Sequence, residues 1–120
     1  MHDEIPSSLT GACGAILVVR IPPDLNHLTA DKLRACVEAR LPEHSEAGVV
    51  LDASSVVLIT SVGIASLLQV QEFARARGVG MCIAGLKGEA LRFLEMLRLE
   101  HTFPLFDDEE DGVAWVQSRD

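Results

Sequence analysis

No stretch of this 120-residue sequence is apolar over the roughly 18 residues that a membrane-spanning helix requires. The first residues carry no basic cluster followed by an apolar segment, so no signal peptide is expected. The three cysteines, Cys13, Cys36 and Cys82, are odd in number and widely spaced, which argues against a disulfide framework. These absences predict a cytoplasmic protein with reduced thiols and no direct insertion into a membrane.

Basic residues are also few. Lysine and arginine total 10 residues against 18 aspartates and glutamates, which gives a formal net charge of −8. The basic residues are scattered along the chain and form no local patch in the sequence. Because an acidic chain repels phosphate backbones, we expect no nucleic-acid partner.

Sequence signatures of catalysis are absent as well. There is no Gly-x-x-x-x-Gly-Lys-Ser/Thr phosphate loop, no Gly-x-Gly-x-x-Gly dinucleotide turn and no Gly-x-Ser-x-Gly nucleophile elbow. The four histidines are far apart and show no metal-ligand spacing with one another or with cysteine. We therefore expect neither an enzyme nor a cofactor or metal site.

Apolar runs of strand length alternate with segments of helical periodicity. Strands are expected at 15–21, 48–51, 56–59, 79–84 and 101–106, with a short partner strand at 7–10 joined to the first by a glycine-containing turn. Helices are expected at 30–41, 61–77, 87–97 and 112–117. This order predicts an α/β fold with about four helices and a mixed, mostly parallel sheet of about four to five strands. We expect one domain over 1–120, with its core at about 15–106.

The periodicity also predicts which residues are buried. The expected buried side of the helix at 61–77 is Ile64, Leu67, Leu68 and Ala74, and that of the helix at 87–97 is Ala90, Phe93, Leu94 and Leu97. Gly78 is expected to end the former helix in a left-handed conformation. The acidic run at 107–111 would complement the dipole at the start of the last helix, which would bury Val113 and Val116.

The segment at 52–65, DASSVVLITSVGIA, is the most informative part of the sequence. Asp52 and Ser54 follow an expected strand, at the edge where open α/β sheets usually place functional groups. Ser61 lies at the expected start of a helix, where it can act as the N-cap or tolerate a phosphate. Gly63, in the first turn, would let the backbone of a partner approach closely. The residues alone leave both roles of Ser61 open.

Several segments, taken in order, carry a resemblance to a known family. They are PDLNHLTA at 23–30, Asp52-Ala53-Ser54, TSVGIA at 60–65, IAG at 83–85 and LRFLEMLRL at 91–99. Through them the chain resembles the STAS domain of anti-sigma factor antagonists from 15 to about 106. Ser61 occupies the position of the serine that is phosphorylated in this family, while Thr60 and Asn26 stand where the family carries acids.

The resemblance implies a non-enzymatic partner switch. An unphosphorylated antagonist binds an anti-sigma factor that is also a histidine-kinase-like serine kinase, and so frees the sigma factor. Phosphorylation of Ser61 would release this kinase, and a serine phosphatase would reset the cycle; Thr60 is the second candidate acceptor. The residues that the resemblance places at the partner surface are Asn26, Asp52, Ser54, Thr60, Ser61, Val62, Gly63 and Gly85.

Three alternatives remain. STAS domains also act as scaffolds or regulatory subunits of signalling or transport complexes, in which Ser61 would not be phosphorylated. A phospho-acceptor receiver domain would use Asp52, but it needs an acidic pair after the first strand, and Asp24 is a single acid there. A small enzyme would need a catalytic constellation that only the tertiary structure could assemble.

Overall fold

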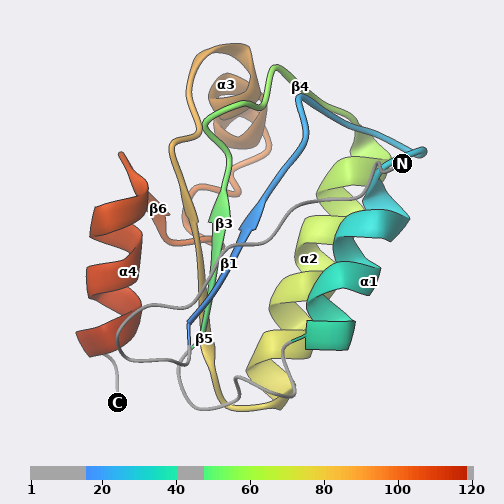
Figure 1. Ribbon diagram of the computed structural model, residues 1–120. Helices are drawn as coiled ribbons and strands as arrows, with labels where there is room; N and C mark the ends of the chain where they lie inside the picture. The colour runs from blue at the N-terminus through green and yellow to red at the C-terminus, as the bar shows by residue number, and fades with distance from the viewer. Residues whose placement is uncertain (1–15, 41–47, 119–120) are drawn as a thin grey trace.

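Four of the expected apolar runs form one parallel sheet. The structure is a computed structural model that describes residues 16–40 and 48–118 (Figure 1). Within these residues the sheet has the order β1-β3-β5-β6, and its strands are β1 (Ile16–Arg20), β3 (Gly48–Asp52), β5 (Gly80–Ala84) and β6 (Leu105–Phe106). All neighbouring strands are parallel, with Val18 opposite Val50 and Val50 opposite Cys82. The partner strand expected at 7–10 lies outside the described residues.

A second, two-stranded sheet lies beyond the carboxyl ends of the main strands. It pairs β2 (Asp24–Leu25) with β4 (Leu58–Ile59) in parallel. The carbonyl of Pro23 accepts hydrogen bonds from the N–H groups of both Val57 and Leu58, at 2.7 and 3.1 Å. The apolar run at 56–59 therefore forms a short ladder with β2 and does not join the main sheet.

Helices cover both faces of the main sheet. They are α1 (Ala30–Arg40), α2 (Ser61–Ala76), α3 (Gly88–Met96) and α4 (Glu109–Ser118). In Figure 1, α1 and α2 lie side by side on one face, α4 lies on the other, and α3 lies beyond the carboxyl ends of the strands. Alternate strand residues therefore enter two cores, which explains why the central strands are apolar throughout.

Several expected buried positions are wrong in detail. Leu68 is 38% exposed, because it lies about 100° around α2 from Leu67, whereas Val70 is fully buried. Leu97 is 46% exposed and lies just past the end of α3. Val113 is half-buried, while Val116 is buried as expected.

Element ends also differ from the sequence prediction. The strand expected at 101–106 is only β6, because its first residues form a turn in which the Phe103 N–H donates to the Leu99 carbonyl at 3.2 Å. The last helix begins at Glu109 and not at Gly112, since Asp108 Oδ1 accepts the Asp111 N–H at 2.9 Å. Part of the acidic run therefore forms the first turn of α4, where it complements the helix dipole.

Cys82, on β5, is buried against α4, whereas Cys36 is half-buried. Burial raises the pKa of the Cys82 thiol to about 12. Because the thiolate is the reactive form, iodoacetamide at pH 8 should leave Cys82 unmodified in the folded protein and label it in urea. Mass spectrometry of the cysteine peptides reads both states, and rapid native labelling of Cys82 would contradict this burial.

The Cys82 thiol also affects how stability depends on pH. In the unfolded chain this thiol ionises near pH 9, below its pKa of about 12 in the folded protein, so its contribution makes the free energy of unfolding fall as pH rises above about 9.

Candidate functional site

The start of α2 is capped by Thr60, not by Ser61. The Thr60 backbone is extended, and its hydroxyl oxygen accepts the Gly63 N–H at 3.3 Å. Ser61 is the first helical residue, one position further along than the N-cap that the sequence predicts. Thr60 and Ser61 both carry a hydroxyl group that could cap the helix. Which of them becomes the N-cap depends on the backbone angles before the helix, and these are not evident from the sequence.

Ser61 itself is exposed, as is Val62 beside it. No hydrogen bond joins the Ser61 hydroxyl to another described residue, whereas the Thr60 hydroxyl contacts both Gly63 and the Leu25 carbonyl. The Ser61 side chain is therefore not needed for the cap, and it projects from the positive end of the helix dipole.

Gly63 is buried against the chain itself. A Cβ atom added at this position would clash with the Leu25 backbone oxygen and lie 3.0 Å from the Leu25 Cγ. The same oxygen accepts the Thr60 N–H at 3.0 Å. The close backbone approach that this glycine allows is thus that of β2, and not that of a partner as the sequence suggested.

Asn26 shapes the turn between β2 and α1. Its N–H donates to the Thr29 hydroxyl oxygen at 3.0 Å, and its Oδ1 accepts the Leu28 N–H at 2.8 Å. The Thr29 hydroxyl donates in turn to the Asp24 carbonyl at 2.8 Å. These bonds hold the turn that leads from β2 into α1 (Figure 1). Leu28, within this turn, is 68% exposed.

Asp52, Ser54 and Gly85 form a separate group at the carboxyl ends of β3 and β5. Asp52 Oδ1 accepts the Ser54 N–H at 3.0 Å, and its Oδ2 lies 3.7 Å from Arg20 Nε. Lys87 Nζ donates to the Ser54 carbonyl at 2.9 Å. Gly85 has a φ of +84°, and a Cβ there would lie 3.1 Å from the Ser54 Cβ. This group fixes the start of the loop that leads to β4.

The structure therefore divides the expected site residues into two sets. One set gathers around Leu25 at the start of α2 and comprises Asn26, Thr60, Ser61, Val62 and Gly63. The other set, Asp52, Ser54 and Gly85, lies on the same edge of the fold but binds mainly to its own loop. Ser61 and Val62 are the exposed members of the first set, and Ser54 is the exposed member of the second.

The sequence prediction missed several exposed apolar side chains in the segments that lead into α1 and α2. Leu28, Val57, Leu58 and Val62 are exposed by 68%, 66%, 51% and 50%. The sequence predicts a strand at 56–59, but among the described residues β4 pairs with β2 alone, so its outer side chains stay uncovered. Two features of the sequence indicated that this run lies near the edge of the fold. Hydroxyl residues flank it, and only a few residues separate it from the strand before it.

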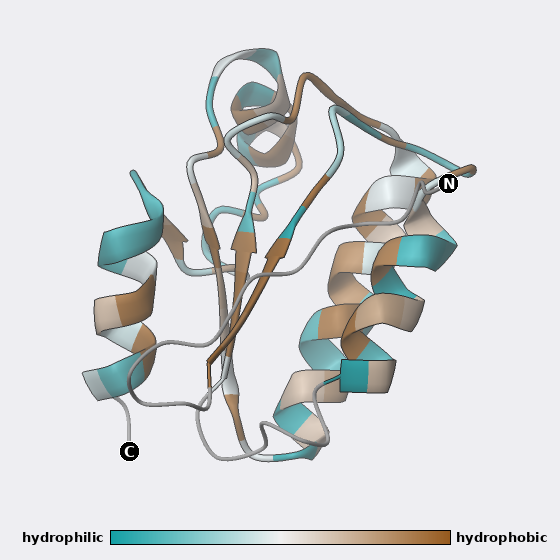
Figure 2. Ribbon diagram, in the orientation of Figure 1, coloured by the Kyte–Doolittle hydropathy of each residue, from teal (hydrophilic) through white to brown (hydrophobic). Residues whose placement is uncertain are grey.

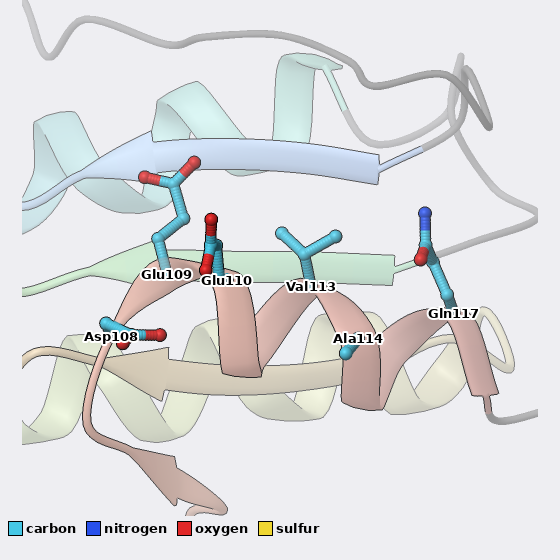
Figure 3. A pocket seen from close by; sticks show the side chains of 6 residues that line it. All are labelled: Asp108, Glu109, Glu110, Val113, Ala114 and Gln117. Carbon is cyan, nitrogen blue, oxygen red and sulfur yellow. The ribbon is translucent and has the colours of Figure 1, made fainter.

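A hollow on α4 lies away from these residues, on the other face of the sheet. Figure 3 shows Glu109, Glu110, Val113 and Gln117 projecting toward the same side of the helix. Asp108 and Ala114 complete its lining. No residue that the sequence analysis placed at a site contributes to it.

The cap gives a direct test of the role of Thr60. Thr60→Ala should lower the free energy of unfolding by about 1 kcal/mol, because the Gly63 N–H loses its acceptor. Thr60→Ser should keep most of the stability, since a serine hydroxyl can accept the same bond. Urea denaturation followed by far-ultraviolet circular dichroism measures both variants, and an unchanged midpoint for Thr60→Ala would show that the cap is dispensable.

A known protein is similar to this chain over most of its length. The curated anti-sigma F factor antagonist of Paenibacillus polymyxa is 23% identical over 102 residues, covering 85% of this chain and 87% of that protein. Among the described residues, no helix is both long and apolar enough to cross a membrane.

Solved structures show the same fold. An anti-sigma factor antagonist from Mycobacterium paratuberculosis matches with a TM-score of 0.78 and 24% identity, covering 96% of each chain. A sulfate transporter family protein from Wolinella succinogenes matches with a TM-score of 0.77 and 17% identity, covering 91% of this chain and 88% of that one. The family model that describes the STAS domain matches residues 10–112. The chain therefore belongs to the STAS domain family.

Proposed function

We propose that this chain is an anti-sigma factor antagonist that switches partners through Ser61. In its unphosphorylated form it binds an anti-sigma factor that is also a histidine-kinase-like serine kinase. Phosphorylation of Ser61 releases that kinase, and a serine phosphatase restores the binding form. The chain itself performs no catalysis in this scheme.

The exposure of Ser61 at the first position of α2 is the observation that carries the proposal. Thr60 holds the cap, so a phosphate on Ser61 need not break a hydrogen bond of the described fold. The phosphate adds about −1.5 to −2 charges at neutral pH, and the helix dipole favours negative charge at this end. Phosphorylation would therefore change the surface while leaving the fold intact.

Thr60 is less suited to be the acceptor. Its hydroxyl donates to the Leu25 carbonyl at 3.4 Å and accepts a hydrogen bond from the Gly63 N–H. The residue is half-buried. A phosphate there would break the cap and crowd β2. These contacts favour Ser61 over Thr60 as the phosphorylated residue.

A pull-down from the native host tests the proposal. The baits are the wild-type chain, Ser61→Ala and Ser61→Asp, and mass spectrometry identifies the bound proteins. We expect a histidine-kinase-like anti-sigma factor with the wild type and Ser61→Ala, and its loss with Ser61→Asp. Recovery of one transporter or scaffold assembly by all three baits would instead indicate a docking domain without a phosphorylation switch.

A further inference from the structure

A groove between β4 and α3 has no covering element among the described residues. It is lined by Val57, Leu58, Ile59, Glu89, Ala90 and Phe93. Its walls are apolar, since the one charged residue in the lining is Glu89, whose carboxylate lies 4.0 Å from the Arg92 guanidinium. Val57 and Leu58 leave 66% and 51% of their surface exposed beside the groove.

One wall of the groove is the chain segment that runs into the start of α2. Its Val57–Ile59 wall leads directly through Thr60 into Ser61 and Val62. Figure 2 shows hydrophobic ribbon along β4 toward the start of α2 and again at the turn before α1. Single exposed apolar residues are ordinary, but an exposed apolar group next to a hollow is typical of a protein-binding surface.

The charge of this surface indicates what kind of contact it makes. The whole chain carries a formal charge of −8, yet Val57, Leu58 and Val62, which lie within four residues of Ser61 in the chain, are exposed and apolar. The exposed acid Asp24 lies opposite Leu58 in the β2–β4 ladder. A partner attracted mainly by charge would be expected at the acidic parts of the chain. A partner that contacts Ser61 and the adjoining β4 segment would therefore meet mainly apolar side chains on β4.

We propose that the anti-sigma factor inserts an apolar side chain into the groove between β4 and α3 when it binds around Ser61. This inference rests on the proposed function and names the chemistry of the partner's contact. Burial of apolar area would supply most of the affinity, so binding should change little between low and high salt. A phosphate on Ser61 would be desolvated at the border of this contact, which explains how one modification can release the partner.

Isothermal titration calorimetry with the anti-sigma factor captured by the wild-type bait and then purified tests the inference. Val57→Asp places a charge in the groove at an exposed position, and we expect at least a tenfold weaker affinity. Leu58→Ser is the second variant and should weaken binding in the same direction. Ala114→Asp adds the same charge at an exposed position on α4, across the sheet, and should bind like the wild type. Thermal unfolding checks that each variant is folded.

The outcomes separate this inference from the proposed function. If the wild-type chain binds and releases its partner through Ser61 but folded Val57→Asp and Leu58→Ser bind equally well, the groove is not a contact and the inference is wrong. If the wild type captures no anti-sigma factor, both proposals fail. If light scattering shows a dimer that Val57→Asp dissociates, the groove holds a second copy of the chain, which also overturns the inference.

Discussion

Gly63→Ala should lower the free energy of unfolding by about 1–3 kcal/mol, because the added methyl group would clash with the Leu25 backbone oxygen. Backbone atoms cannot move aside as a flexible side chain can. Relief of the clash would require β2 to shift away from α2, and this would strain the hydrogen bond from the Thr60 N–H to the same oxygen.

The sign of the change makes this prediction decisive. Alanine has a higher helix propensity than glycine by about 1 kcal/mol, so the substitution should stabilise α2 if nothing lay close to it. Urea denaturation of the wild type and Gly63→Ala gives the sign directly. Ala65→Gly, at an exposed position in the same part of the helix, calibrates the propensity difference. A more stable Gly63→Ala variant would contradict the packing of β2 on α2.

Ser61→Asp should weaken binding of the anti-sigma factor about a hundredfold while leaving the protein folded. A carboxylate buried without a partner at an interface costs about 3 kcal/mol, and each tenfold in affinity is about 1.4 kcal/mol. In the unbound chain the same carboxylate faces the positive end of the α2 dipole, so its thermal stability should be equal or slightly higher.

Calorimetry of binding and thermal unfolding together test this prediction. Ser118→Asp, at an exposed position at the end of α4, introduces the same chemical change away from the proposed interface and should bind normally. Equal affinity of Ser61→Asp and the wild type would remove the basis of the switch. Loss of folding in Ser61→Asp would assign Ser61 a packing role that its exposure does not indicate.

The sequence was sufficient for the main sheet and for the order of its helices. β1, β3 and β5 are apolar runs because helices cover both faces of the main sheet. Such a run lies within a few consecutive residues, so it can be recognised from the sequence alone. Gly78 has a φ of +77° just past α2, as its position predicted. These features depend on residues close together in the chain.

The surroundings of Ser61 could not be predicted in the same way. Leu25 and Thr60 are 35 residues apart in the sequence, but their segments are in contact in the fold. The Leu25 backbone leaves no room for a side chain at Gly63, and the Thr60 hydroxyl, held beside it, caps α2. The exposure of Val57 and Leu58 likewise depends on β4 pairing with β2 and not with the main sheet. Only the tertiary fold brings these segments together.

Phosphorylation of the chain by its captured partner tests the central claim most directly. The wild-type chain and Ser61→Ala are incubated with the purified anti-sigma factor and ATP, and mass spectrometry locates any phosphate while gel filtration follows the complex. We expect one phosphate on Ser61 and dissociation of the wild-type complex, with an unmodified and intact complex for Ser61→Ala. A wild-type chain that stays unphosphorylated, or that keeps its partner after phosphorylation of Ser61, would contradict the partner switch.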